Sequence, residues 1–397
     1  MTRRHDIDAL RVLAFALLIL YHAGMLYVAP TADWGFHLKS THLAGWLQYP
    51  MLLLNRWRME LLFLISGLAV HFMRGRLSLP ALAWKRTVRL LLPLIFGMLV
   101  VVPIQPYVQG RAEHALAPGF LAFLPYYWTH TYHAYGLTWN HLWYLAYLWP
   151  YTILLLALLP ALESPLGRRL RSTATRLRGW PLLILPALPL LVIGALLQRR
   201  FPETHALFGD WWAHALYATM FLYGYLIGTD AALWREFARL RRRSLTLALG
   251  CFAVYLFLDK FAGHLLAHRA LAPWVAPVGV ALWRITRYLY LWSAIVAVLG
   301  WGHAYLDHPF HWLPYAREAV YPWYVLHQSV LLALAGWLFP LRLGPVLEPA
   351  LVVSGTVAGC ALLHECVIRR VRWLRPLFGL EARARHGSDT RPSTTLA

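Results

Sequence analysis

The chain has 397 residues, of which 59% are hydrophobic and 14% are charged, and its 37 Lys and Arg against 17 Asp and Glu give a formal net charge of +20. Soluble domains carry about a quarter charged residues, so this composition excludes an ordinary soluble protein and indicates an integral membrane protein. A basic chain can bind nucleic acid, but the distribution of its basic residues argues against that class.

Ten apolar segments, each near the length needed to cross about 30 Å of hydrocarbon, recur along the whole chain. They cover residues 7–28, 52–73, 87–102, 141–162, 180–198, 211–228, 244–261, 276–299, 320–339 and 346–367. The sequence therefore predicts an all-α integral membrane protein, a bundle of about ten transmembrane helices forming one domain over residues 1–380. Residues 381–397, rich in Arg, Ser, Thr and Pro, are expected to be a disordered tail.

Basic residues gather in the connections between alternate segments. Together with an N-terminal pair of arginines, the clusters at 74–89, 168–178, 235–243 and from 369 onward fall on one side of a ten-helix topology. The opposite connections hold only scattered charges, and this asymmetry predicts cytosolic N and C termini. The positive charge is thus a topology signal, so the lipid bilayer is an expected partner and nucleic acid is not.

The first segment places an arginine and a histidine inside a membrane helix, where both are costly and mark a functional site by default. Arg11 and His22 are eleven residues apart, about three helical turns and roughly 16 Å of rise, so they share one helix face. Asp8 lies one turn before Arg11 and can neutralise it. A charged pair low in the bilayer with an imidazole above it suggests a reaction pathway through the membrane.

The second segment runs inward and puts Glu60 near its outer end, at a depth that His22 can reach. A carboxylate beside an imidazole fixes the tautomer and raises the basicity of the ring, as a general base requires. An ion pair of Glu60 with Arg56 or Arg58 at the interface explains the residue equally well.

Arg86 and Arg89 stand three residues apart at the cytosolic start of the third segment, so both project from one side. Paired guanidinium groups offer fixed bidentate donors to phosphate. A positive-inside flank explains one or two of these residues equally well. A cytosolic, phosphate-bearing donor would need such a basic mouth below Arg11 and His22, and this favours the functional interpretation.

The fourth segment opens with Asn140, His141 and Trp143 at the outer interface. These side chains can hydrogen-bond to and stack on a carbohydrate, or they belong to an interfacial aromatic belt. The outward loop expected before them, 103–140, carries many aromatic residues that suit the same two roles.

The eighth segment carries Arg284 and Arg287, which are deep enough to make snorkelling difficult, so they should face the bundle interior or a wet cavity. They can bind an anionic acyl group or a donor phosphate, or pair with a structural carboxylate such as that of Asp259.

Other polar residues in apolar segments are expected to have structural roles. Ser66 and Gly67 form a small-residue step that permits close helix packing, and Ser66 lacks an adjacent base that would make it a nucleophile. Tyr324 and His327 share one face of the ninth segment, where a buried histidine beside a tyrosine is more often a packing residue than a catalyst.

Two histidine pairs, His130 with His133 and His308 with His311, invite a metal interpretation. Neither pair has an accompanying cysteine or acidic ligand at a recognisable metal spacing, so no metal site is predicted. The three cysteines offer no disulfide framework.

Several of these motifs, in this order, resemble the acyltransferase 3 family of ten-helix membrane acyltransferases. Residues 11–22, an arginine and a histidine separated by ten residues, look like the family signature. Residues 60–67 resemble its acidic or apolar residue followed by Phe-Phe-x-x-Ser-Gly, 86–93 its Arg-x-x-Arg-Leu-x-Pro element, and 141–145 its His-Leu-Trp-Phe-Leu element. Residues 321–328 are similar to the branch containing the glucan succinyltransferase of periplasmic glucan synthesis.

The resemblance spans roughly residues 3–367. The chain departs from the family pattern at Leu61 and Leu62, which replace part of the usual aromatic pair, and at Leu68, which replaces the usual Phe after Ser-Gly. These departures do not touch the expected chemistry, but they weaken any assignment to a substrate subgroup.

The resemblance implies transfer of an acyl group, acetyl or succinyl, from cytosolic acyl-CoA to a hydroxyl of an extracytoplasmic glycan or similar acceptor, in the inner membrane of a bacterium. Acyl-CoA is then a donor substrate, and no tightly bound cofactor is expected. The head of CoA is expected at Arg86 and Arg89 and its arm along the stripe of Arg11, which presents the thioester to His22 as general base, with Glu60 assisting. An acyl-histidine intermediate is the mechanistic alternative.

A multi-pass transporter is the alternative class, because intramembrane charges are as characteristic of transporters as of membrane enzymes. In that case Arg11, His22, Arg284 and Arg287 would line a translocation path. Inverted repeats or helix pairs broken by Gly or Pro would favour it, and the sequence has no clear pairing of that kind.

Overall fold

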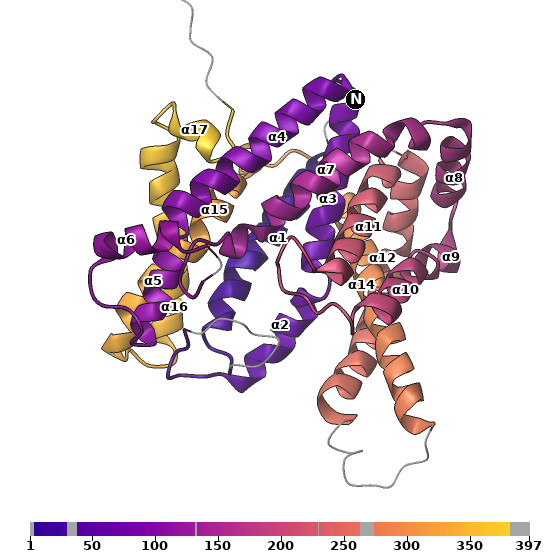
Figure 1. The fold of residues 1–397 in the computed structure, drawn as a ribbon. Helices are drawn as coiled ribbons and strands as arrows, with labels where there is room; N and C mark the ends of the chain where they lie inside the picture. The colour runs from indigo at the N-terminus through magenta and orange to yellow at the C-terminus, as the bar shows by residue number, and fades with distance from the viewer. Residues whose placement is uncertain (1–3, 30–37, 132, 229, 263–273, 382–397) are drawn as a thin grey trace, which may run out of the picture.

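The computed structural model describes residues 4–29, 38–131, 133–228, 230–262 and 274–381 (Figure 1). Within these ranges the regular structure is helical, with an isolated bridge between Thr131 and Leu137. All but the first residue of the expected tail, 381–397, lies outside the described residues.

In the first half of the chain the helices are α1 (His5–Met25), η1 (Gly45–Leu47), α2 (Gln48–Asn55), α3 (Arg58–Arg74), α4 (Leu79–Phe96), η2 (Gly97–Val101), α5 (Ile104–Ala112), α6 (Phe120–Thr129), η3 (Asn140–Leu142), α7 (Trp143–Leu162), α8 (Pro165–Thr175), α9 (Gly179–Ile184) and α10 (Ala187–Leu197). The second half contains α11 (Trp211–Ile227), α12 (Ala231–Phe257), η4 (Leu258–Ala262), α14 (Val275–Tyr305), α15 (Leu313–Leu338), η5 (Phe339–Leu341), α16 (Leu347–Leu362), η6 (Leu363–Ile368) and α17 (Leu374–Leu377).

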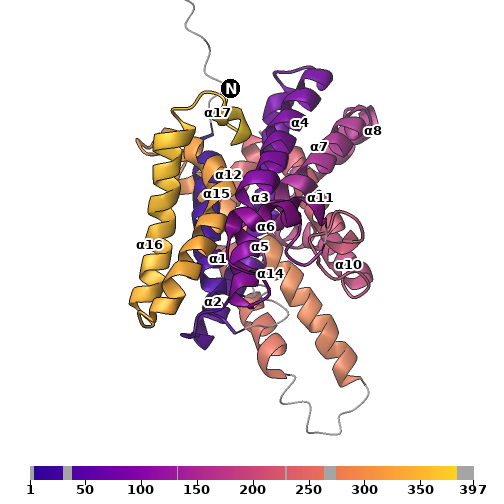
Figure 2. The ribbon, with the colours of Figure 1, turned by 60° about the vertical axis from the view of Figure 1, so that its left-hand side comes forward.

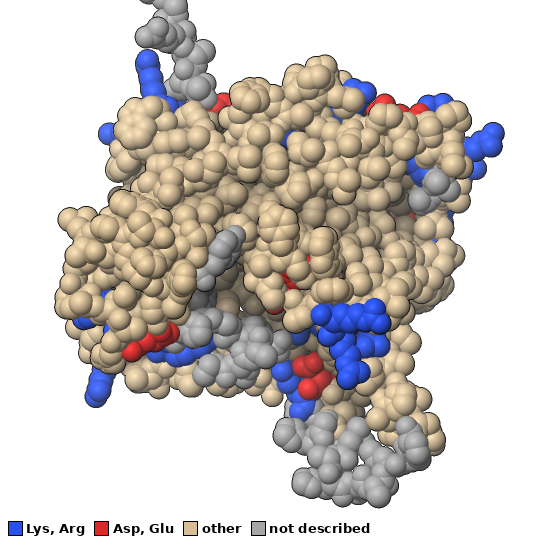
Figure 3. Space-filling view, in the orientation of Figure 1, with Lys and Arg blue, Asp and Glu red and all other residues tan. Residues whose placement is uncertain are grey.

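Six helical stretches of the described chain are long and apolar enough to cross a membrane, by length and composition: His5–Met25, Leu79–Ala112, Asn140–Leu162, Gly179–Leu197, Leu313–Leu341 and Leu347–Ile368. On the face shown in Figure 3, charged side chains lie mainly along two opposite edges, with a largely uncharged band between them. The predicted all-α membrane protein is thus confirmed in class, and the ten apolar segments all lie largely on helices. That all ten cross the membrane, with both termini in the cytosol, stays a prediction.

Helix α1 lies inside the bundle, where it contacts α3, α14, α15 and α16 (Figures 1 and 2). Helix α12 packs along α14, and this long pair extends beyond the rest of the bundle, while α15 packs on α16. The start of α1 and helix α17 lie at the same end of the molecule in both views. The described chain therefore starts and finishes on one side of the bundle, as an even number of crossings requires.

Helices α3 and α11 cross in backbone contact. A Cβ atom built at Gly67 would lie 1.8 Å from the carbonyl oxygen of Phe221, and one built at Gly224 would lie 1.8 Å from the carbonyl oxygen of Leu64. Only glycine fits at either position, because small residues let helix backbones approach this closely. The close packing predicted at Ser66-Gly67 is therefore present.

Two parts of the chain differ from the sequence expectations. The segment 180–198 is broken into α9 and α10 around Pro186, since proline lacks the N–H of a helical hydrogen bond. The expected loop 103–140 contains α5 and α6. Pro103 caps the start of α5, a position where the missing N–H of proline breaks no helical hydrogen bond. The third apolar segment can therefore continue through the π-helical η2 into α5.

Candidate active site

A cavity of about 1000 Å³ lies within the bundle, near the C-terminal end of α1. Its walls come from α1, α3, α7, α14 and α15 and from residues 198–205 between α10 and α11. Predicted site residues from five separate segments line it: His22, Glu60, Asn140, His141, Trp143, Arg287 and Tyr324.

His22 forms a hydrogen-bonded pair with His327 beside this cavity. Nδ1 of His22 lies 2.8 Å from Nε2 of His327, and Nδ1 of His327 lies 2.8 Å from the carbonyl oxygen of Tyr324. A carbonyl can only accept, so Nδ1 of His327 carries that ring's proton and its Nε2 accepts the hydrogen bond that Nδ1 of His22 donates. A neutral His22 is then unprotonated at Nε2, the state that a general base needs.

His141 packs edge-on against His327, with ring centroids 5.2 Å apart. The side-chain amide of Gln105 donates to Nδ1 of His141 at 3.0 Å, and Nε2 of His141 donates to the carbonyl oxygen of Val325 at 3.1 Å. Gln105 is 1% exposed and also donates to Ser329. His141 is thus a fixed part of the wall. Gln105 was not predicted from the sequence, although an amide directly after an apolar segment was a usable signal.

Glu60 lines the same cavity and is 6% exposed. Over the described residues it forms neither a hydrogen bond with His22 nor an ion pair with Arg56 or Arg58, and its Oε2 is buried without a hydrogen-bond partner. The structure gives His22 a different partner, His327, in place of the carboxylate that the sequence suggested.

The connection between α10 and α11 forms part of the cavity wall. His205 lies 3.2 Å from Glu203, and Tyr217 donates to the same carboxylate at 2.6 Å. Burial raises the pKa of Glu203, but the hydrogen bond and charge of His205, the hydrogen bond from Tyr217 and the charge of Arg287 outweigh it and hold the pKa at about 2. The ring of His205 stacks on Trp143 at 4.3 Å. Glu203 and His205 were not predicted from the sequence, because they lie outside the apolar segments.

The arginines predicted to bind phosphate lie close together toward the opposite end of α1. Arg11 is ion-paired with Asp8 at 3.3 Å, and Asp8 also lies 3.8 Å from Arg317 at the start of α15. Arg86 is buried, whereas Arg89 is exposed. The charges of Arg89 and Arg317 both act on Arg11. Arg317 was missed because it precedes the apolar segment of its helix.

Phe15 lies between Arg11 and His22 along α1 and belongs to a group of aromatic rings. It lies 5.4 Å from Tyr324, and Tyr144 lies 6.1 Å from Tyr324, with Tyr144 and Tyr324 also lining the cavity. The hydroxyl of Tyr144 shares a hydrogen bond of 2.6 Å with Ser66, which fixes its position. We term Phe15, Tyr144 and Tyr324 the aromatic floor.

Arg287 and Arg284 have different surroundings. Arg287 is 7% exposed, lines the cavity and lies 5.4 Å from the ring of Trp212 and 5.3 Å from that of Trp283. Arg284 does not line the cavity, and within the described chain neither arginine is ion-paired with Asp259. The transporter interpretation placed both arginines on one path, and of the two only Arg287 lines this cavity.

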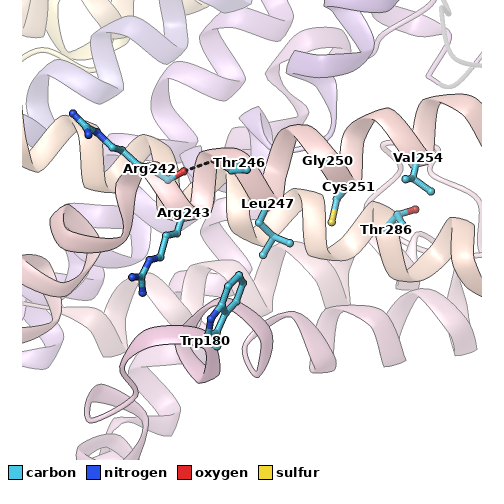
Figure 4. A pocket seen from close by; sticks show the side chains of 9 residues that line it. All are labelled: Trp180, Arg242, Arg243, Thr246, Leu247, Gly250, Cys251, Val254 and Thr286. Atoms are coloured by element: carbon cyan, nitrogen blue, oxygen red, sulfur yellow. Dashed lines mark hydrogen bonds between the residues drawn. The ribbon is translucent and has the colours of Figure 1, made fainter.

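A second hollow, of about 800 Å³, lies between α9, α12 and α14. Figure 4 shows the side chains that line it: Trp180, Arg242, Arg243, Thr246, Leu247, Gly250, Cys251, Val254 and Thr286. None of these nine residues carries an imidazole or a carboxylate, so the hollow lacks a general base and is not the candidate site.

Among the described residues, Asp6, His303 and Asp307 offer a possible metal-ligand group. Arg4 already occupies it, because its Nε donates to Asp6 at 2.9 Å and its guanidinium lies 3.9 Å from the ring of Trp234. The group therefore holds a cation of the chain itself, and it ties the start of α1 to the end of α14.

The sequence profile of an acyltransferase domain, acyltransferase 3, matches residues 4–365, nearly the whole chain. The chain belongs to this family. No curated protein and no solved structure matches it. The resemblance drawn from the motifs is confirmed at family level, and the protein is an acyltransferase. Its place in the branch of the glucan succinyltransferase stays a prediction.

Proposed function

We propose that this acyltransferase moves an acyl group from acyl-CoA, bound on the cytosolic side of a bacterial inner membrane, to a hydroxyl of a glycan or related acceptor on the other side. The pairing of His22 with His327 carries this proposal, because it leaves an unprotonated imidazole nitrogen in a cavity large enough for an acceptor. In this topology ten helices cross the bilayer and both termini are cytosolic.

His22 acts as the general base of the transfer. Its Nε2 takes the proton of the acceptor hydroxyl while the oxygen forms a bond to the thioester carbonyl carbon. The C–S bond then breaks, and the proton passes to the departing CoA thiolate, so that an ester and CoA thiol leave. The hydrogen bond from Nδ1 of His22 to His327 stabilises the imidazolium that exists in between. In the acyl-histidine alternative the same Nε2 attacks the thioester carbonyl, and the acceptor then takes the acyl group.

The arginine cluster suits the donor. Arg11, Arg86, Arg89 and Arg317 bring four guanidinium groups together with the carboxylate of Asp8, and such a surplus of positive charge fits the phosphates of CoA. Roughly 16 Å of helix separate Arg11 from His22, a distance that the long, thin pantetheine arm can span. That arm must displace the aromatic floor to present the thioester.

The outer wall suits a sugar. Trp143 offers a ring for stacking, and Asn140 and Glu203 offer polar groups that bind hydroxyls, all within the same cavity. This combination supports a glycan acceptor better than an apolar one.

The test uses purified enzyme in lipid nanodiscs with radiolabelled acetyl-CoA or succinyl-CoA and a glycan acceptor. Release of CoA thiol and labelling of the acceptor are measured for the wild type, for His22→Ala and for the exposed outer-loop control His133→Ala. We expect His22→Ala to abolish both signals and His133→Ala to keep them. Wild-type rates in His22→Ala would remove His22 from the chemistry, and no thioester loss with any donor would overturn the proposed function.

A further inference from the structure

Arg58 is a buried cation whose charge the described protein leaves incompletely balanced. It is the first residue of α3, is 2% exposed and lines the cavity that contains His22. Its Nε and Nη1 atoms are buried and make no hydrogen bond, and no carboxylate of the described residues is ion-paired with it. Its Cζ lies 4.0 Å from the ring centroid of Tyr21, a cation–π contact.

The contact with Tyr21 compensates only part of the cost of burying Arg58. A desolvated cation–π contact is weaker than the penalty for moving a guanidinium out of water, and two buried N–H groups without acceptors add to that penalty. A buried cation that lines a cavity gains most by binding an anionic group there, since no carboxylate of the described residues is ion-paired with Arg58.

The acidic residues of the cavity do not supply that anion. Glu203 is held by His205 and Tyr217. Asp259 is ion-paired with Lys260 at 3.2 Å. Glu60 forms no ion pair with Arg58, as described above.

Arg58 is separated from the proposed base by a single ring. The guanidinium of Arg58 packs on the ring of Tyr21, and this ring lies edge-to-face with the ring of His22, with centroids 5.8 Å apart. An anionic group held by Arg58 therefore leaves the rest of a small substrate next to His22. Arg287, on the opposite element α14, adds a second buried cation to the same cavity.

We propose that Arg58 binds a carboxylate carried by one of the two substrates and thereby selects a substrate that is anionic close to its reacting group. This inference rests on the proposed function only for the identity of that substrate. Two sources share the chemistry: the far end of a dicarboxylic acyl group on CoA, or an acidic sugar in the acceptor. A guanidinium matches a carboxylate in two parallel hydrogen bonds, and that geometry distinguishes it from a neutral group of the same shape.

The first experiment measures binding without turnover. The thermal unfolding midpoint of the full-length enzyme in nanodiscs is recorded with free succinate and with the uncharged succinamide. We expect succinate alone to raise the midpoint in the wild type, Arg58→Met to lose this effect, and Arg58→Lys to keep part of it. The control Arg200→Met removes an exposed cation outside the cavity lining and should respond like the wild type.

The second experiment identifies the source of the carboxylate. CoA release is compared for succinyl-CoA and butyryl-CoA, and acceptor labelling is compared for glucuronic acid and glucose. If the acyl group carries the carboxylate, the wild type prefers succinyl-CoA by about 10- to 100-fold in kcat/KM and Arg58→Met loses that preference. If the acceptor carries the carboxylate, Arg58→Met loses the preference for glucuronic acid over glucose instead. The ratio of kcat/KM for succinyl-CoA to that for butyryl-CoA then stays unchanged.

The outcomes separate the two proposals. The role of Arg58 is overturned if the wild type shows the same kcat/KM for charged and neutral donors and for charged and neutral acceptors, and if succinate does not raise its unfolding midpoint. This holds even if acyl transfer proceeds. Succinate binding that depends on Arg58, in an enzyme that consumes no acyl-CoA, overturns the proposed function instead. If Arg58→Met does not fold, the wild-type selectivity and its retention in Arg58→Lys decide the question.

Discussion

Nδ1 of His22 donates a hydrogen bond to Nε2 of His327, 2.8 Å away, and this contact joins the C-terminal end of α1 to the middle of α15. The two residues are 305 positions apart in the chain. His327, a packing residue by its local sequence, is thus the group that sets the tautomer of the proposed base.

His327 should act as a positioning residue. We expect His327→Ala to lower kcat by about 10²-fold, because His22 loses the acceptor that fixes its tautomer, with little change in the KM of either substrate. His327→Gln, whose amide oxygen can accept the same hydrogen bond, should recover part of the rate. Steady-state kinetics on the three proteins decide the matter, and equal losses in both variants would indicate a packing role only.

Arg317 should contribute to binding of the donor. Its position beside Asp8, with Arg11 and Arg89 nearby, places its charge where the CoA phosphates are expected. We expect Arg317→Met to raise the KM for acyl-CoA by about tenfold and to leave kcat nearly unchanged. The exposed Arg370→Met serves as the control for loss of one positive charge near the C-terminal end of the bundle. An unchanged donor KM in Arg317→Met would leave this residue a purely topological role.

The crossing of α3 and α11 should tolerate no side chain. Gly67→Ala places a Cβ against the carbonyl oxygen of Phe221, so we expect a loss of about 1–3 kcal/mol in the free energy of unfolding. Gly250→Ala, in open space on α12, should leave stability unchanged or slightly raised. Thermal unfolding of the two variants in the same detergent tests this, and equal midpoints would contradict a backbone contact at the crossing.

Stability should depend on pH through Glu203. Its folded-state pKa of about 2 lies below the ordinary 4.5, so the ionised form stabilises the fold. That contribution is fully present above the ordinary pKa and is lost as the pH falls toward 2. We therefore expect the unfolding midpoint of the wild type to fall more steeply between about pH 5 and pH 3 than that of Glu203→Gln. If the unfolding midpoints of the wild type and Glu203→Gln changed with pH in the same way, the hydrogen bonds of Glu203 would not form in the membrane-embedded protein.

The topology can be tested with single cysteines in a Cys366→Ser background. Ala117→Cys lies in an exposed position between α5 and α6, and Thr173→Cys lies in an exposed position on α8. A membrane-impermeant maleimide should label Ala117→Cys from outside intact spheroplasts and Thr173→Cys only after the membrane is opened. The reverse pattern would invert the predicted orientation and with it the side of the donor.

The sequence predicted best the contacts within a single helix. The spacing of Arg11 and His22 places both on one face of α1, and the ion pair with Asp8 follows from the same helix geometry. Arg86 and Arg89 were likewise singled out from their three-residue spacing, because that pattern is local in sequence.

Contacts between distant helices were not predictable from single segments. The partner of His22 depends on how α15 is rotated against α1, which hydrophobic periodicity does not determine. The same holds for Gln105, which reaches His141 from a helix expected to be a loop. Arg58 was weighed only as an ion-pair partner of Glu60, since its unmatched burial becomes visible only when Tyr21 and the cavity surround it.

We expect the aromatic floor of Phe15, Tyr144 and Tyr324 to act also as a barrier to ions. An enzyme that takes its donor from one compartment and delivers to the other risks an ion leak along an arginine-lined approach. The hydroxyl of Tyr144 is hydrogen-bonded to Ser66, and that of Tyr324 donates to the carbonyl oxygen of His141, so each hydroxyl has a partner within the bundle. We expect the floor to keep the electrochemical gradient across the membrane intact between turnovers.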